Sequence, residues 1–559
     1  MQWKQDFTPI ADNLALSAVI ALIPILYFFW ALAVKRMKGY MAGLTTLLVA
    51  LVVAVIAYKM PVGMAVMSVT QGAVYGLLPI GWIIITSVFL YKLTVKTGQF
   101  DTIRNSVLSI TEDRRLQALL IAFSFGAFLE GAAGFGAPVA ISAALLVGLG
   151  FHPLYAAGIC LIANTAPVAF GAIGIPITAV AGPTGIPAME ISKMVGRQLP
   201  FLSVFIPFYL VLIMAGWKKT VEVLPAILVS GISFAITQYV SSNFLGPELP
   251  DILSALVSLV ALTIFLKVWK PKTIYRFASE AHSEVAAAVQ VQKTHTSGEV
   301  LKAWSPFLVL TAFISIWGIP QVKAALTGHY EGTNSILKAL NTLGHYFTFM
   351  PEVPGLSNKI IGASGQPIPA VYKLEVLGAA GTAILLAAIV TKFIVNISWK
   401  EWTATFGETL NELKFPIVTI ASVVGFAYVT NASGMSTTLG MTLAKTGSLF
   451  AFFSPFLGWL GVFITGSDTS SNLLFGNLQK VTATSIGMDP VLAIAANSSG
   501  GVVGKMISPQ SIAVACAAVG LAGKESDLFR FTIKHSIFLI ILIGILTFLQ
   551  SNVLSWMIP

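Results

Sequence analysis

The chain has 559 residues, of which 56% are hydrophobic and only 10% are charged. A soluble globular domain carries about 25% charged residues, so this composition excludes a soluble fold. The net charge of +10 does not indicate nucleic-acid binding, because the sequence contains no soluble module that could present a basic face. Many apolar windows of about 20 residues, each long enough to cross a bilayer, instead predict an all-α, polytopic membrane protein.

Apolar segments continue along the whole chain and define the expected elements. In chain order they fall at about 14–34, 40–57, 72–92, 116–130, 137–150, 155–180, 198–215, 224–240, 251–267, 303–319, 377–394, 415–430, 449–464, 471–479, 490–507, 509–522 and 535–556. Several are too short to span a hydrocarbon layer of about 30 Å. We therefore interpret the stretches around 126–150 and 457–479 as re-entrant hairpins of two half-helices, which need surrounding protein or a wet cavity.

Basic residues predict how these segments are oriented, because Lys and Arg gather in cytoplasmic loops. The first span is followed by Lys35, Arg36 and Lys38, and the third span is followed by a longer basic strip. The N-terminus is therefore expected outside the cell. Residues 270–302 are then a cytoplasmic linker, and residues 321–376, which lack a basic excess, are an external segment.

Two motifs about 330 residues apart follow one pattern. The first runs from Gly126 to Pro138 and the second runs from Gly461 to Asn472. Further equivalent residues recur at a spacing of 333, namely Asn164 and Asn497, Gly171 and Gly504, and Pro176 and Pro509. A duplicated unit with broken, polar-tipped membrane segments is typical of secondary transporters.

The two copies carry their positive charge on opposite sides. Copy one is basic before its motif, at Arg104, Arg114 and Arg115, whereas copy two is basic after its motif, at Lys524 and Arg530. This asymmetry predicts repeats of inverted topology. The expected divisions are N-terminal spans in 1–70, repeat one in 71–217, connecting spans and linker in 218–302, further spans in 303–400, and repeat two in 401–559.

Each motif contains one carboxylic acid. Glu130 lies in an apolar segment, where an ionised carboxylate costs at least about 2.5–3.5 kcal/mol. Such a group can bind and release a proton, or it can be a structural residue that caps a hairpin helix. Asp468 stands just before an expected helix start near Thr469, where free N–H groups and the helix dipole favour an anion. Ordinary helix capping is the alternative reading of Asp468.

Lys505 follows Gly504 inside an apolar run and is expected to pair with the carboxylate of a substrate. An ion pair with Glu130 or Asp468, or snorkelling of the side chain toward a membrane face, is the alternative. Helix breaks near Asn164 and Asn497 would free backbone groups for a ligand, although a packing kink gives the same pattern. Polar residues near these breaks complete the expected substrate site: Asn164, Thr165, Ser467, Thr469, Ser470, Ser471, Asn497, Ser498, Lys505 and Gln510.

Glycines next to these polar groups are expected to act as hinges of the hairpins. They are Gly131, Gly134, Gly136, Gly466, Gly500 and Gly504. Close approach of neighbouring helices is the alternative reading of such glycines. The six histidines show no helical metal-ligand spacing, so neither a metal ion nor a cofactor is expected.

These strings resemble the bacterial L-lactate permease family. The resemblance runs over nearly the full length, and its most specific parts are Gly126 to Pro138, Phe463 to Asn472, Gly504 to Ser511 and Gly523 to Phe531; it is weakest in 279–300 and 325–372. It implies proton-coupled uptake of L-lactate, and also of D-lactate and glycolate, across a bacterial inner membrane. It also implies kinship with a superfamily of ion transporters that have inverted repeats, re-entrant hairpins and elevator-type motion.

Three functional hypotheses follow. The first is a proton symporter for a small 2-hydroxy monocarboxylate, in which Lys505 and the half-helix N-termini hold the anion and Glu130 or Asp468 carries the proton. The second is a sodium-coupled carrier of small carboxylates, with Na⁺ held by oxygens at the Asn164 and Asn497 breaks. The third is a membrane-embedded hydrolase. The expected partners are the substrate, the proton and the lipid bilayer, and a homo-oligomer is compatible with the sequence.

Overall fold

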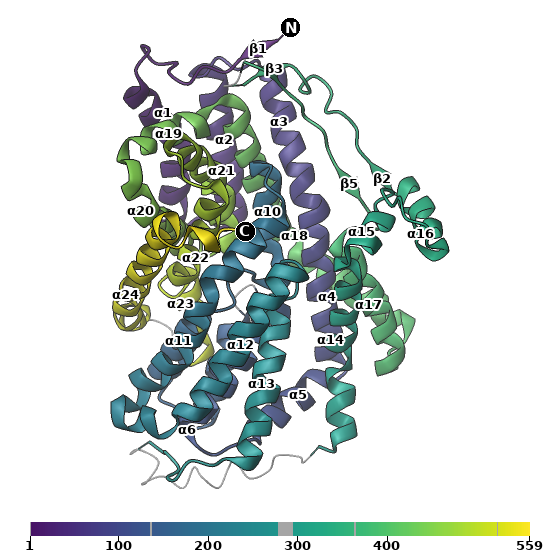
Figure 1. Cartoon of the computed structure of the whole chain (residues 1–559), viewed down its shortest axis with the longest axis vertical. Coiled ribbons are helices and arrows are strands. Elements are labelled where there is room, and N and C mark those ends of the chain that lie inside the picture. Colours follow the sequence, from purple (N-terminus) through teal and green to yellow (C-terminus); the bar gives the residue numbers. More distant parts are fainter. Residues whose placement is uncertain (1, 133, 135–136, 278–294, 363–364, 522–523) are drawn as a thin grey trace.

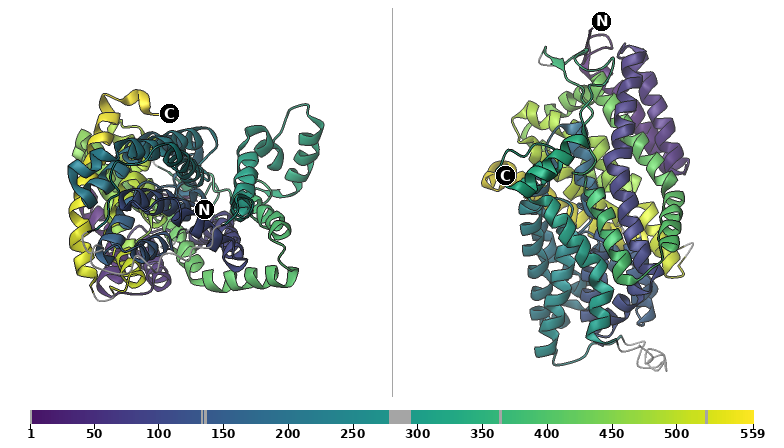
Figure 2. Two further views of the ribbon diagram at one scale, coloured as in Figure 1. Left: turned by 90° about the horizontal axis from the view of Figure 1, so that it is seen from below. Right: turned by 90° about the vertical axis from the view of Figure 1, so that its right-hand side faces the viewer.

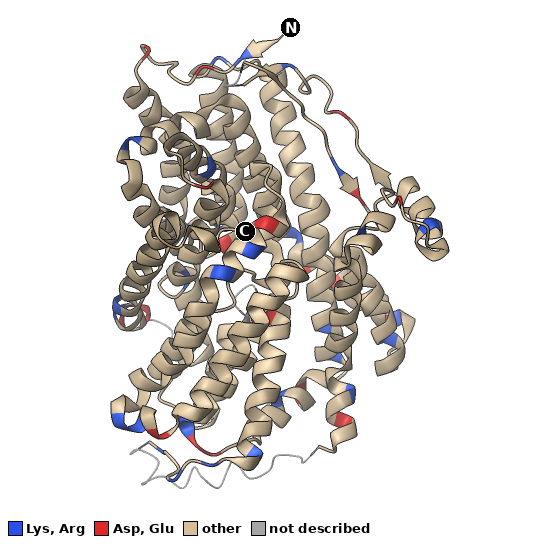
Figure 3. Cartoon of the chain, in the orientation of Figure 1, with Lys and Arg blue, Asp and Glu red and all other residues tan. Residues whose placement is uncertain are grey.

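The computed structural model describes residues 2–132, 134, 137–277, 295–362, 365–521 and 524–559. These residues form an elongated bundle of helices (Figure 1). Within this described part, twelve helical stretches are long and apolar enough to cross a membrane. Charged residues are sparse along the helices and gather mainly near their ends (Figure 3). The structure therefore confirms an all-helical, polytopic membrane protein.

The first half of the chain builds much of the lower part of the molecule in Figure 1. Its helices are α1 (Leu14–Phe29), α2 (Gly39–Ile56), α3 (Val62–Tyr75), α4 (Trp82–Lys96), α5 (Gln99–Leu108), α6 (Arg114–Gln117), α7 (Gly126–Ala132), α8 (Ala137–Gly148), α9 (Pro153–Ala163), α10 (Ile175–Thr184), α11 (Ala188–Glu222), α12 (Leu224–Phe244) and α13 (Pro250–Val268). A π-helical turn that contains Pro79 joins α3 to α4, and a second π-helical stretch, Ala118–Phe125, leads into α7.

The second half begins with a segment that stands apart from the main body. Its helices are α14 (Ser297–Gly318), α15 (Pro320–Leu326), α16 (Ser335–Tyr346) and α17 (Ala380–Val395). In the view from below, this teal and green part projects to one side (Figure 2, left). The remaining helices are α18 (Trp399–Ser433), α19 (Met435–Leu443), α20 (Phe450–Thr465), α21 (Asp468–Ile486), α22 (Pro490–Lys505), α23 (Pro509–Ala518) and α24 (Glu525–Asn552).

Short strands tie the N-terminus to the segment that was expected outside. They are β1 (Trp3–Lys4), β2 (Thr348–Phe349), β3 (Ile360–Ile361), β4 (Pro367–Ile368) and β5 (Leu374–Glu375). β1 pairs in parallel with β3, so the N-terminus and this segment share one end of the molecule. α13 ends and α14 begins at the opposite end (Figure 1). The described ends of the expected linker, at α13 and α14, therefore lie far from β1 (Figure 1).

Prolines and glycines end the apolar helices where the site lies. α20 stops at Gly466, which has a φ of +71°, a left-handed conformation that glycine adopts without a steric penalty. α9 stops before the Asn164–Pro167 turn, and Gly171 follows with a φ of +53°. Both breaks were expected from the sequence. The expected hinge Gly136 lies outside the described residues.

One expected break is wrong. Asn497, Ser498, Ser499 and Gly500 lie inside α22, which continues as a regular helix to Lys505. Gly500 and Gly504 are therefore not hinges within this helix. A Cβ atom at either position would overlap the backbone of α20, so these glycines let the two helices approach closely. Gly131 is likewise helical, and it packs against α13 rather than forming a turn.

Candidate transport site

Glu130 lies on the last turn of α7 and is 3% exposed. Its Oε1 accepts a hydrogen bond from the Lys505 ammonium at 2.8 Å, and its Oε2 accepts one from the Asn164 amide at 3.1 Å. The Lys505 side chain, at the end of α22, is 11% exposed. A buried ion pair therefore joins two segments that are 375 residues apart in the sequence. The structure thus contains the ion pair with Glu130 that was the alternative reading of Lys505.

The short turn after α7 positions Glu130. The helix ends at Ala132, and Gly134 has a φ of +59° with its N–H donating to the carbonyl of Leu129 (3.2 Å). One residue after Glu130, Gly131 lies so close to α13 that a Cβ atom there would be 2.9 Å from the Cβ of Asp251. The glycine thus brings the Glu130 turn against the beginning of α13.

Asp468 is the first residue of α21 and is 4% exposed. Ser467 caps the helix, because its Oγ accepts the N–H of Ser470 at 3.2 Å. The Oδ2 of Asp468 accepts hydrogen bonds from Ser498 (2.6 Å) and Asn472 (3.2 Å). Its Oδ1 has no hydrogen-bond partner and faces Gly501 of α22. Asp468 therefore has one carboxylate oxygen that accepts hydrogen bonds and one that does not.

The amide and hydroxyl groups of α22 form a network with α21. Asn497 donates to Asn472 Oδ1 at 2.9 Å and accepts from Gln479 at 3.1 Å. Asn472 also lies 3.3 Å from the carbonyl of Pro176, the second residue of α10. Asn497 and Ser498 thus contact Asp468 or its partner, although they do so from an unbroken helix.

The other expected substrate contacts differ in their surroundings. Ser471 is fully buried and donates to the Gly458 carbonyl at 3.1 Å, a contact that fastens α21 to α20. Thr165 is fully buried, and its hydroxyl has no hydrogen-bond partner. Thr469 is half-buried in the first turn of α21, while Gln510 is exposed beside Gly466. Thr165 therefore has free hydrogen-bonding capacity, whereas Ser471 is already used in packing.

Lys505 lies among three buried acids. Besides its hydrogen bond to Glu130, it interacts electrostatically with Asp251 and with Asp468. We call Glu130, Asp251 and Asp468 the carboxyl cluster. Within the described residues, no three His, Cys, Asp or Glu side chains are placed to share one metal ion. The cluster is arranged around the ammonium group of Lys505.

Sequence reasoning missed Asp251 and Asn472. Asp251 was treated as the boundary of an apolar span, although an acid in the first turn of such a span carries the same desolvation cost as Glu130. That cost was the signal that could have identified it. Asn472 closed the second motif but was not counted as a site residue, because its four-residue spacing from Asp468 on one helix face was overlooked.

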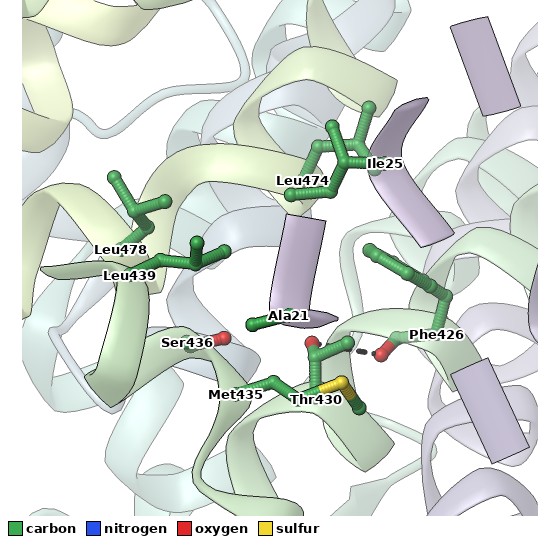
Figure 4. A pocket seen from close by; sticks show the side chains of 9 residues that line it. All are labelled: Ala21, Ile25, Phe426, Thr430, Met435, Ser436, Leu439, Leu474 and Leu478. Atoms are coloured by element: carbon green, nitrogen blue, oxygen red, sulfur yellow. Dashed lines mark hydrogen bonds between the residues drawn. The ribbon is translucent and has the colours of Figure 1, made fainter. Parts of the chain in front are cut away.

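Two cavities lie outside the cluster. The smaller has about 10 Å³, enough for about one water molecule. Figure 4 shows its side chains, which are mainly apolar: Ala21, Ile25, Phe426, Thr430, Met435, Ser436, Leu439, Leu474 and Leu478. The larger has about 280 Å³ and lies between α3, the end of α10, α18 and the 356–371 segment. Neither of these cavities is lined by the carboxyl cluster or by Lys505.

Comparisons with known proteins give a consistent result. A family model described as L-lactate permease matches residues 17–554. The L-lactate permease of Bacillus subtilis (strain 168) is 75% identical over 565 positions, covering 100% of both chains. The glycolate permease GlcA of Escherichia coli (strain K12) is 54% identical, covering 100% of this chain and 99% of that protein.

Solved structures with a similar fold include a bacterial membrane protein. It is MtrF of Neisseria gonorrhoeae, from a class of antimetabolite efflux pumps, with a TM-score of 0.51 and 13% sequence identity. The alignment covers 91% of this chain and 95% of MtrF. At this identity the likeness concerns the fold alone.

Proposed function

The chain belongs to the L-lactate permease family, and from this premise we propose that it imports L-lactate, and also D-lactate and glycolate, together with a proton across the bacterial inner membrane. The observation that carries the proposal is the buried Lys505–Glu130 pair, with N and O atoms 2.8 Å apart. A lysine at this depth offers the substrate carboxylate a fixed positive charge in a medium of low dielectric constant.

The substrate carboxylate would compete with Glu130 for Lys505. A 2-hydroxy monocarboxylate also carries a hydroxyl group, which can donate one hydrogen bond and accept others. Thr165 and the Oδ1 atoms of Asn164 and Asp468 have no partner in the closed protein, so they are available to this hydroxyl. The N-terminus of α21, where Ser467 caps the N–H of Ser470, adds a favourable helix dipole for the anion.

A proton balances the charge of the substrate. The closed site holds three carboxyl groups and one ammonium group, so another anion would be repelled unless a carboxyl group were neutral. Sequence analysis assigned the proton to Glu130 or Asp468. In our proposal both belong to the carboxyl cluster, and the loaded site carries a proton together with lactate.

We also infer that the two halves are inverted repeats. The series α7 to α11 and the series α20 to α24 have the same order of a helix pair, a third helix that ends near a polar turn, a ten-residue helix with proline near its start, and a long helix. Residues 62–96 and 399–433 form two further stretches of 35 residues each. This correspondence supports the division at 71–217 and 401–559, with the starts of the repeats moved to residues 62 and 399.

The hairpins give the proposed repeats a way to move. The pairs α7–α8 and α20–α21 each reverse at a glycine with positive φ, Gly134 and Gly466. We interpret them as re-entrant hairpins whose tips close the site from the two sides of the membrane. Because the cluster is buried here, substrate access requires a conformational change, and elevator-type motion of the hairpins is the proposed form.

Transport in proteoliposomes tests this function. A proton gradient directed into the proteoliposomes, with the outside more acidic, should drive accumulation of L-lactate. A sodium gradient directed inward at equal pH on both sides should not. Accumulation driven only by sodium would favour a sodium-coupled carboxylate carrier, and the free oxygens at Asn164 and Thr165 would then be the first candidates for its ion site. Product formation in detergent without accumulation in sealed vesicles would instead indicate a hydrolase.

A further inference from the structure

Asp251 is a buried acid without a hydrogen-bond partner. It lies in the first turn of α13, is 2% exposed, and neither of its carboxylate oxygens is hydrogen-bonded. The peptide group of Gly171 lies nearby, but its N–H donates to the carbonyl of Pro167 at 3.1 Å. Glu130 and Asp468 both have hydrogen-bond donors, so Asp251 differs from the other members of the cluster. In such surroundings an ionised carboxylate costs more free energy than a protonated carboxyl group does.

Charged groups reach Asp251 from two directions. Glu130 of α7 and Lys505 of α22 interact with it electrostatically. Among the other elements that pack closely on α13, α12, the π-helical stretch Ala118–Phe125 and the 172–174 turn carry no charged residue. The titratable side chain of α12, Tyr239, is 42% exposed. Lys505 is therefore the cation that an ionised Asp251 would use.

Lys505 cannot pair with Glu130, Asp251 and a substrate carboxylate at the same time. In the closed protein it holds Glu130, and it lies within electrostatic range of Asp251. Ionised Asp251 would pair with the part of the Lys505 ammonium group that Glu130 does not use. Protonated Asp251 would leave that part free for a substrate carboxylate. Proton binding at Asp251 and anion binding at Lys505 are then linked, which is the requirement for symport.

Building on the proposed function, we propose that Asp251 is the proton-binding residue of this transporter. Glu130 remains ionised as the standing counter-ion of Lys505. The proton binds to an Asp251 carboxylate oxygen from the outer side, lactate then binds to Lys505, and both leave on the inner side. The empty protein returns with ionised Asp251 paired to Lys505.

The test is the variant Asp251→Asn, measured in two assays. Asparagine resembles the neutral acid in size and cannot release a proton, so Lys505 stays free for lactate. Exchange of labelled lactate for internal lactate should continue and should lose its dependence on pH. A gradient of one pH unit supports about tenfold accumulation in one-to-one electroneutral symport. Wild-type protein should approach this ratio, and Asp251→Asn should remain near unity.

Control variants separate proton binding from folding. Asp251→Glu restores a titratable group and should recover part of the accumulation. Glu248→Gln changes a carboxyl group three residues earlier, which interacts with Lys323 rather than Lys505, and should accumulate lactate like wild type. In purified Asp251→Asn, lactate affinity should be equal at pH 6 and pH 8, whereas wild-type affinity should fall at the higher pH.

Specific results would overturn the assignment. They are full, pH-dependent accumulation by Asp251→Asn, or loss of both exchange and lactate binding in that variant. Failure of wild-type protein to accumulate lactate under a pH gradient would instead reject the proposed function itself. The two failures are distinguishable because the wild-type assay tests only the proposed function, whereas the Asp251→Asn assay tests the assignment of the proton-binding residue.

Discussion

Lys505 is the residue on which anion binding depends. Its ammonium group lies 2.8 Å from Glu130 and has two further acids within electrostatic range. We predict that Lys505→Ala weakens lactate binding by about 10- to 100-fold, the equivalent of one charge-assisted hydrogen bond of about 1.5–3 kcal/mol. Calorimetric titration of the purified protein with lactate measures this change. An unchanged affinity would move the anion site away from the cluster.

Glu130 keeps the Lys505 side chain in place. The Lys505 ammonium group then has two anionic partners, Glu130 and the substrate carboxylate. In Glu130→Gln, ionised Asp251 becomes the remaining close partner of Lys505 and competes with lactate. We therefore predict that this variant loses uptake driven by a pH gradient. Gradient-driven uptake in vesicles is the measurement, with Glu190→Gln as a control, because Glu190 pairs with Lys193 near the start of α11. Wild-type accumulation in Glu130→Gln would remove Glu130 from the coupling scheme.

At the scale of helices, the contact between α22 and the α20–α21 turn depends on glycine. A Cβ atom at Gly501 would overlap Oδ1 of Asp468, and one at Gly500 would overlap the carbonyl of Pro455. We predict that Gly501→Ala lowers thermal stability, with a cost of about 1–3 kcal/mol for overpacking. It should also reduce lactate binding, because Asp468 must shift.

The matched control for this variant is Gly63→Ala. Gly63 lies in helix α3, and a Cβ atom there would meet no atom within 4 Å. This change should leave the melting temperature unchanged or slightly raised, since alanine favours helix more than glycine does. Equal melting temperatures for both variants, measured in the same detergent, would show that α22 has room beside Asp468.

The sequence predicted most helices and two of the breaks because both depend on local chemistry. Apolar runs determine the spans, and glycines with positive φ mark the break after α9, at Gly171, and the end of α20, at Gly466. The prediction of a helix break at Asn497 was wrong because a pair of glycines can have either of two structural roles. They can end a helix, or they can let two helices touch, and only the position of α20 decides between them.

The site was predicted in part for a related reason. Glu130, Asp468 and Lys505 are conspicuous as charged residues in apolar runs, and the structure brings them together. Asp251 lies at a helix end, where an acid is ordinary in a soluble protein. Its burial results from the close approach of Gly131 across 120 residues of sequence, and that contact has no local signature.

At the scale of the whole molecule, the buried cluster indicates that the protein must open to accept its substrate. Thr165 is fully buried with an unpartnered hydroxyl group, so cysteine at this position probes opening. We predict that Thr165→Cys reacts with a water-soluble maleimide during turnover, and that saturating lactate slows the reaction. The native cysteines, Cys160 and Cys516, are both buried and can be replaced first.

Thr391→Cys is the matched control for this labelling. Thr391 in α17 is also fully buried and its hydroxyl also lacks a partner, but it lies outside the proposed substrate site. It should remain unreactive with and without lactate. Equal reactivity at both positions would indicate general unfolding rather than opening of the site.

A structure of the protein with bound L-lactate tests the central claim most directly. We predict that the lactate carboxylate lies within about 3 Å of Lys505 Nζ, in a charge-assisted hydrogen bond. The lactate hydroxyl should face Thr165 or the first turn of α21. Density for lactate in the larger cavity beside Tyr428, with the Lys505–Glu130 pair intact, would contradict the proposal that the carboxyl cluster is the transport site.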